Sequence, residues 1–80
     1  MTTSTHTEEY QALRAILRKA RHNAGVTQQQ LAERLGKPQS YVAKVEGGER
    51  RIDVIEFIAF VRAIGGDPAA VFTSVSKAVE

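Results

Sequence analysis

The residues "LGKPQSYV", Leu35 to Val42, place a glycine and a proline between two stretches with helical periodicity. Gly36 can take the positive φ that ends a helix, and Pro38 suits the first turn of a new helix, where no backbone N–H donor is required. Three side chains with hydrogen-bonding groups follow the proline: Gln39, Ser40 and Tyr41. A junction of about three residues is too short for an antiparallel hairpin, so we expect the second helix to leave the first at a steep angle.

The helix after this break, expected at about residues 38–46, has one apolar side and one polar side. On a wheel of about 100° per residue, Val42, Val45 and Glu46 share the inner side. The outer side carries Ser40 and Lys44, with Ala43 and Tyr41 beside them and Gln39 in the open first turn. A slim helix face with many donors and acceptors fits the DNA major groove, about 12 Å wide, where glutamine matches adenine and lysine matches guanine.

Two further helices are predicted on the N-terminal side of the break. Thr27 caps the nearer helix, and Gln30 three residues later completes a capping box. The other helix begins at Thr5 or Thr7 and ends at Gly25. The expected inward residues are Leu31, Ala32 and Leu35 on the nearer helix, and Tyr10, Leu13, Leu17, Ala20 and Ala24 on the other.

Two more helices are predicted on the C-terminal side. Asp53 caps the first of them, and a stop-and-restart signal, Gly65 and Gly66 followed by Asp67 and Pro68, separates it from the second. The expected inward stripe of the first is Val54, Phe57, Ile58, Val61 and Ile64, and the apolar residues of the second are Val71, Phe72, Val75, Ala78 and Val79. The sequence therefore predicts an all-α, compact five-helix fold with short connections.

Length and composition exclude several classes of protein. The 80 residues are enough for one small domain, which we expect over residues 7–80 after a disordered tail over residues 1–6. The chain has no cysteine, so disulfide frameworks and cysteine-based zinc or redox sites are excluded. Its N-terminus has no signal-peptide pattern, and the longest apolar run, "VIEFIAFV", is too short to span a bilayer. We expect a cytoplasmic protein.

Positive charge is concentrated in the middle of the chain. Between Arg14 and Arg51, nine Lys and Arg residues stand against three Asp and Glu residues, which gives +6, whereas each flank carries −2. A basic middle with acidic flanks indicates a polyanionic partner. The plainer alternative is a solvated helix surface.

No motif in the sequence indicates an enzyme. His6 falls in the expected tail and His22 on a polar helix face, and no paired carboxylates or metal-ligand spacing is present. Gly47-Gly48 lacks the GK[ST] part of a phosphate-binding loop. We expect no enzymatic activity, no metal and no cofactor.

The stretch "TQQQLAERLGKPQSYVAKVEGGER", residues 27–50, resembles the helix-turn-helix core of Xre-type regulators, the group of the lambdoid phage repressors and Cro proteins. The matching positions are Gln28, Leu31, Ala32, Gly36, Val42, Val45 and "EGGER", with Arg21, Gly25, Ile64 and Gly65 at the ends of flanking helices. The resemblance covers about residues 13–72. It implies a lambda-repressor-like domain with its helix-turn-helix at about 27–46. It also implies a transcriptional regulator that binds double-stranded DNA. Repression is the default expectation for a protein this small, because a repressor needs only to occupy its site.

The resemblance also implies roles for single residues. Base contacts fall on Gln39, Ser40 and Lys44, and contacts with the DNA backbone on Gln28, Tyr41, Arg50 and Arg51. Arg21 and Glu46 match an ion pair that joins the first and third helices of the family. Two positions depart from the family pattern, Pro38 in place of a hydroxyl residue and Glu49 in place of a basic one. Arg14 and Arg18 are candidates to compensate for them.

Apolar residues outside the expected core predict that two copies pair. These are Ile55, Ala59, Phe72 and Val75, and they would form the interface of a homodimer on an inverted repeat. Alternatively, the last helix folds back over them within one chain.

A different functional hypothesis is an antitoxin or protein-interaction module, whose main partner is a toxin-like protein and whose DNA binding serves autoregulation. An adaptor that has lost DNA contact is a further alternative.

Overall fold

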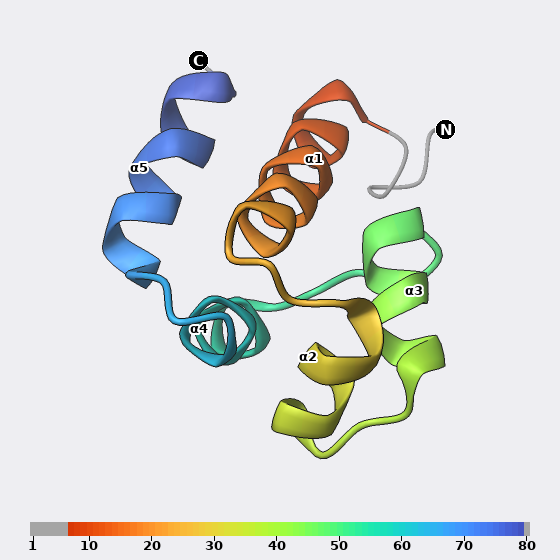
Figure 1. Cartoon of the computed structure of the whole chain (residues 1–80). Helices are drawn as coiled ribbons and strands as arrows, with labels where there is room; N and C mark the ends of the chain where they lie inside the picture. The colour runs from red at the N-terminus through yellow and green to blue at the C-terminus, as the bar shows by residue number, and fades with distance from the viewer. Residues whose placement is uncertain (1–6, 80) are drawn as a thin grey trace.

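The computed structural model describes residues 7–79, and within them it contains five helices and no strand. The helices are α1 (Glu8–Asn23), α2 (Gln28–Leu35), α3 (Gln39–Gly47), α4 (Val54–Ala63) and α5 (Pro68–Ala78). The predicted all-α five-helix fold is confirmed (Figure 1). The tail predicted over residues 1–6 lies outside the described residues.

Local hydrogen bonds start the helices at the positions that the sequence indicates. Of the two threonines considered for α1, Thr7 caps it, because its hydroxyl accepts a hydrogen bond from the backbone N–H of Tyr10 at 3.1 Å. Thr27 and Gln30 form the predicted reciprocal capping box of α2. Asp53 caps α4 in a second capping box with Glu56, and Asp67 caps α5.

The turn between α2 and α3 combines a left-handed residue with an extended one. Gly36 has φ 67° and ψ 33°, and the N–H of the next residue, Lys37, bonds back to Ala32 O at 2.9 Å. Pro38 is extended, with φ −70° and ψ 155°, and is the N-cap of α3 rather than its first helical residue. Only a residue without a Cβ adopts the left-handed conformation without strain, so Gly36 allows α3 to leave in a new direction (Figure 1).

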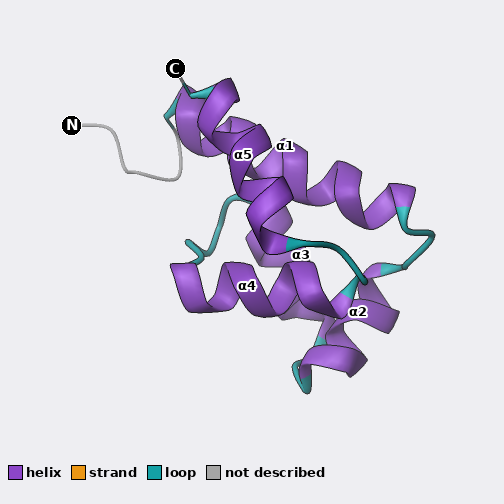
Figure 2. Ribbon diagram, turned by 90° about the vertical axis from the view of Figure 1, so that its left-hand side faces the viewer, coloured by secondary structure: helices purple, strands orange, loops and turns teal. Residues whose placement is uncertain are grey.

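The five helices enclose one core. α1 packs against α3 and α5, α4 packs against α2 and α5, and α2 packs against α3 (Figures 1 and 2). The core residues are Tyr10, Leu17, Val26, Leu31, Ala32, Val42, Val45, Ile52, Phe57, Phe60, Val61 and Ile64. Val42 and Val45 are fully buried, which anchors α3 along its whole inner side.

The structure corrects the predicted inward faces at three positions. Val54 is 70% exposed, whereas Phe60, which was not predicted, is fully buried. Because α4 is covered by both α2 and α5, its buried face is wider than one stripe, while its first turn lies at an open groove beside α1 and α5. Ala24 is exposed rather than inward, since α1 has already ended and Ala24 is its C-cap.

We expect Phe60→Ala to lower the free energy of unfolding by about 3 to 5 kcal/mol, because it empties a fully buried site. Val54→Ala is the matched control on the same helix and should stay within about 0.5 kcal/mol of the wild type. Urea unfolding followed by circular dichroism measures both. Similar losses in the two variants would contradict the assigned orientation of α4.

Candidate nucleic-acid interface

The outer side of α3 carries polar side chains that no other part of the described chain engages. Gln39, Ser40 and Lys44 are all exposed, and between residues 7 and 79 their side chains make no hydrogen bond or ion pair. Directly behind them, Val42 and Val45 are fully buried. The helix is therefore held from one side and leaves its donors and acceptors free on the other.

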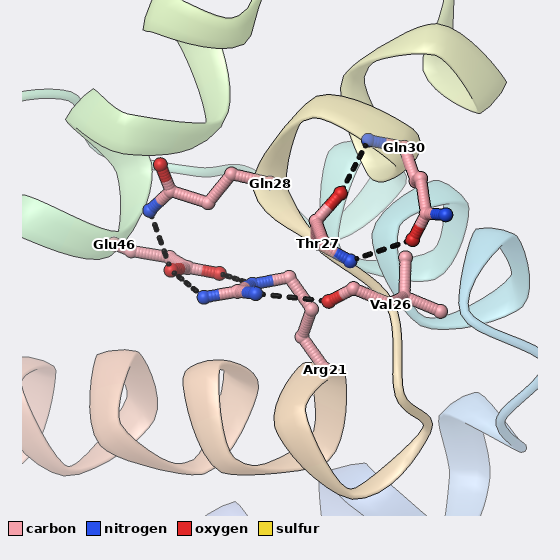
Figure 3. A network of polar contacts seen from close by, with 6 residues as sticks. All are labelled: Arg21, Val26, Thr27, Gln28, Gln30 and Glu46. Atoms are coloured by element: carbon pink, nitrogen blue, oxygen red, sulfur yellow. Dashed lines mark hydrogen bonds and ion pairs between the residues drawn. The ribbon is translucent and has the colours of Figure 1, made fainter.

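A buried ion pair joins α1 to α3. Arg21 Nε donates to Glu46 Oε2 at 2.6 Å, and Arg21 Nη2 donates to Glu46 Oε1 at 2.9 Å (Figure 3). Arg21 Nη1 also donates to the carbonyl of Val26 at 2.9 Å, in the link between α1 and α2. The side chains are only 8% and 4% exposed. Two parallel bonds between a guanidinium and a carboxylate allow one relative geometry, so the pair fixes how α3 sits on α1.

Gln28 extends this network to α2. Its Nε2 donates to Glu46 Oε1 at 3.0 Å, so Glu46 receives hydrogen bonds from two other helices (Figure 3). The family resemblance implied that Gln28 touches phosphate and braces the first base-reading side chain, and it did not identify this bond to Glu46. An amide nitrogen has two hydrogens, so the Glu46 bond leaves one N–H of Gln28 for another acceptor.

Opposing effects act on the pKa of Glu46. Burial is the largest and favours the neutral acid, but the hydrogen bonds from Arg21 and Gln28 and the charges of Arg21 and Arg18 together outweigh it. The pKa of Glu46 therefore lies below its ordinary value of 4.5. Glu46 therefore stays ionised at neutral pH, and its hydrogen bonds stabilise the folded state.

A second cluster joins Tyr41, in the first turn of α3, and Arg50, in the loop after α3, to Glu56 on α4. Arg50 Nη2 donates to Glu56 Oε2 at 2.8 Å and Nη1 donates to Oε1 at 3.2 Å. The Arg50 guanidinium also lies 4.8 Å from the ring centroid of Tyr41, and Lys37 Nζ lies 5.4 Å from the same centroid. Burial, followed by the charge of Glu56, raises the pKa of Tyr41, so its phenol stays protonated. Tyr41 and Arg50 thus already have partners within the protein.

Arg51 differs from Arg50. It is exposed, and its guanidinium lies 5.0 Å from the ring centroid of Tyr10. The Tyr10 hydroxyl accepts a hydrogen bond from the backbone N–H of Ile52 at 2.8 Å, which ties the loop after α3 to α1. Arg51 has no carboxylate partner in the described chain, so its charge is available to an anion.

Two of the residues considered for pairing, Phe72 and Val75, line an apolar groove, whereas Ile55 lies outside it. Ile55 is 73% exposed and Phe72 62% exposed, while Val75 is half-buried. The groove has a volume of about 170 Å³ and lies between α1, α4 and α5, with Val54, Phe72 and Val75 among its lining residues. Ala59 is exposed on α4 but does not line the groove.

Residues 7–79 also bear on metal binding and membrane insertion. No group of three or more His, Asp or Glu side chains there is placed to hold a metal ion. None of the helices in that range is both long and apolar enough to cross a membrane. Among the described surfaces, the outer side of α3 and its basic surroundings remain the candidate site.

Comparisons with known proteins match this geometry. A family model described as a helix-turn-helix domain matches residues 12–71. A solved structure of an XRE-family like protein from Pseudomonas syringae pv. tomato str. DC3000 is 51% identical, with a TM-score of 0.87 over 94% of this chain and 92% of that one. No curated protein sequence matches the chain.

The clp gene regulator ClgR from Corynebacterium glutamicum is similar in two solved structures. One is 25% identical, with a TM-score of 0.79 over 94% of this chain and 97% of that one. The other is 27% identical, with a TM-score of 0.77 over 89% of this chain and 76% of that one. The whole arrangement of the five helices is therefore shared with these proteins.

Removing the Glu46 carboxylate should destabilise the protein. We expect Glu46→Ala to lower the free energy of unfolding by about 3 kcal/mol, because Arg21 stays buried without its partner. Glu33→Ala is the control, an exposed glutamate on α2 without a hydrogen bond or ion pair in the described chain. Equal urea midpoints for wild type and Glu46→Ala would refute the structural role of the pair.

The same pair predicts a dependence on pH. The folded-state pKa of Glu46 is depressed, so its stabilisation is complete above the unfolded-state value of about 4.5 and is lost as pH falls through the lower folded-state pKa. Wild type should therefore exceed Glu46→Gln in stability at pH 7, and the difference should shrink below about pH 4.5. Urea unfolding from pH 7 to pH 3 measures it. A difference that is constant across this range would contradict the assignment.

Proposed function

The chain belongs to the Xre-type helix-turn-helix family of DNA-binding transcription regulators, and we propose that it is a repressor that binds an inverted repeat as a homodimer. In this proposal α3 lies in the major groove and α2 crosses the backbone. The observation that carries it is the outer side of α3, where three exposed polar side chains are free of internal partners.

Gln39, Ser40 and Lys44 are the proposed base contacts. Glutamine pairs with adenine through two hydrogen bonds, lysine donates to guanine, and serine contacts either. Their freedom from internal contacts supports this role, because no existing hydrogen bond has to break when DNA binds. The buried ion pair beneath them supports it further, since it restricts α3 to one orientation.

The proposed backbone contacts differ in how they reach phosphate. Gln28 lies at the positive N-terminus of α2, and its remaining N–H adds a donor there. Arg51 offers an uncommitted charge. Arg50 is paired with Glu56 and lies against the ring of Tyr41. We therefore propose that Arg50 and Tyr41 mainly stabilise the edge of the DNA-binding surface, and that they contact phosphate with the atoms that these interactions leave exposed.

Repression is the proposed outcome of binding. A repressor needs only to occupy its site, and the described five helices suffice for that. The similarity to the clp gene regulator ClgR supports a role in transcription. Which genes this chain controls depends on the DNA sequence that its own base contacts select.

A homodimer is proposed because one helix-turn-helix unit contacts a single half-site. Two half-sites lie about 34 Å apart on one face of the duplex, and two copies bind both. The apolar groove and the exposed Ile55 and Phe72 support pairing through α4 and α5, with Ala59 and Val75 beside them. No residue of the described part of α5 is buried within its own chain, so this helix has apolar area left for a partner.

The DNA-binding proposal is tested by selection from a random duplex library at about 150 mM salt, where nonspecific attraction is weak. We expect an enriched inverted repeat. Lys44→Ala should then cost about 1 to 3 kcal/mol at one base position and leave the other positions unchanged. Arg62→Ala, an exposed cation on α4, is the control and should bind as the wild type does. No enrichment, with binding that disappears as salt rises, would exclude sequence-specific regulation.

The dimer is tested by sedimentation equilibrium with and without the selected duplex. Phe72→Glu should yield monomers that remain folded, since Phe72 is 62% exposed. Lys77→Glu changes an exposed residue about 140° away from Phe72 around the same helix, and it should leave the dimer intact. A wild-type protein that is monomeric at high micromolar concentration, on DNA and off it, would overturn the proposal. The apolar surface would then belong to a different protein partner.

A further inference from the structure

A cleft with cationic walls runs along α1 beside the end of α3. It has a volume of about 520 Å³, and its cationic lining residues are Arg14, Arg18 and Lys19. Glu46 also lines it, but both Glu46 oxygens accept hydrogen bonds from Arg21 or Gln28. The single carboxylate in the lining is therefore already hydrogen-bonded to Arg21 and Gln28. It does not neutralise the three cations that line the cleft.

The cations of the cleft form no ion pair at contact distance in the described chain, although the charge of Arg18 contributes to the lowered pKa of Glu46. Arg18 and Lys19 are exposed and form no hydrogen bond or ion pair in the described chain. Arg14 is partly buried, and its Nε is fully buried without a hydrogen-bond partner. A buried donor without a partner costs free energy, so a change of Arg14 rotamer that brings its Nε to an anion in the cleft would be favourable.

The cleft lies next to the surface proposed to bind DNA. The Arg14 guanidinium lies against Gly48, so closely that a Cβ there would come 2.9 Å from Arg14 Cζ. Gly48 is the C-cap of α3, and Glu46, two residues earlier, is bonded to Gln28 at the start of α2 (Figure 3). The cleft therefore lies beside the start of α2, where Gln28 is a proposed phosphate contact.

We propose that this side of α1 is a second phosphate-binding surface, which holds the DNA backbone beyond the half-site that α3 contacts. It rests on the proposed DNA-binding function and extends it to flanking DNA. Residues 14 and 18 are one turn apart, a rise of about 6 Å along α1, so their charges form a row rather than a point. A row of cations suits a polyanion, and phosphate contacts position the protein without reading sequence.

The test compares two duplexes that carry the same selected site. One ends at the edge of the site, and the other extends about ten base pairs, one helical turn, on each side. The variant Arg18→Ala/Lys19→Ala removes two exposed cations, and Arg62→Ala/Lys77→Ala removes two exposed cations on α4 and α5 as the control. Affinity is measured from 50 to 200 mM salt by fluorescence anisotropy.

On the extended duplex, we expect the salt slope of the Arg18→Ala/Lys19→Ala variant to be flatter by about 1.8, for two lost phosphate contacts. Between 50 and 200 mM salt the wild type should then lose about 12-fold more affinity than the variant. On the trimmed duplex the two proteins should behave alike, and their base preferences should be the same. The control variant should match the wild type on both duplexes.

Equal salt slopes for wild type and variant on the extended duplex would overturn the inference. A second arm titrates pyrophosphate into the free protein and follows the Arg14 Nε–H by NMR. Saturable binding at micromolar pyrophosphate, without any effect of duplex length, would assign the cleft to a small anion and equally overturn it. If the wild type selects no sequence, a flatter salt slope for Arg18→Ala/Lys19→Ala on a duplex of arbitrary sequence would support this surface, although the proposed sequence-specific function would fail.

Discussion

The orientation of α3 depends on one buried carboxylate. Glu46 receives two hydrogen bonds from Arg21 on α1 and one from Gln28 on α2, so three helices meet at a single side chain. Burying two charges gains little net stability over an apolar contact, but a wrong arrangement leaves both unpaired at high cost. The network therefore acts chiefly on geometry: it rejects other placements of α3, and apolar contacts such as those of Val42 and Val45 supply the stability.

A second set of contacts holds the loop that follows α3. Arg50 pairs with Glu56 and lies against Tyr41, and Glu56 also completes the capping box of α4. The pKa of Glu56 is lowered first by its hydrogen bond from Arg50 and then by the backbone bond from Asp53, so the carboxylate stays charged. The helix is thus anchored along its inner side by its two buried valines, near its end by Glu46 and after its end by Arg50. The free side chains on its outer side are therefore presented on a rigid element.

The net charge of +2 understates the positive potential on this side of the molecule. Opposite charges neutralise each other only where they lie close together, and Glu46 is paired with Arg21 and hydrogen-bonded by Gln28. The cations beside it, Arg14, Arg18 and Lys19, keep their charge for solvent or a ligand. The distribution of pairs, rather than the count of charged residues, decides where a polyanion is attracted.

The sequence by itself determined the five helices, their caps and the turn at Gly36, because these depend on residues within about four positions of each other. The sequence alone also identified the family, because the helix-turn-helix pattern lies in one continuous stretch. Only the tertiary structure decided that Phe60 is buried and Val54 exposed, and that Gln28 bonds to Glu46 across 18 positions of the chain. Those outcomes depend on which helices pack together, and local periodicity carries no information about that.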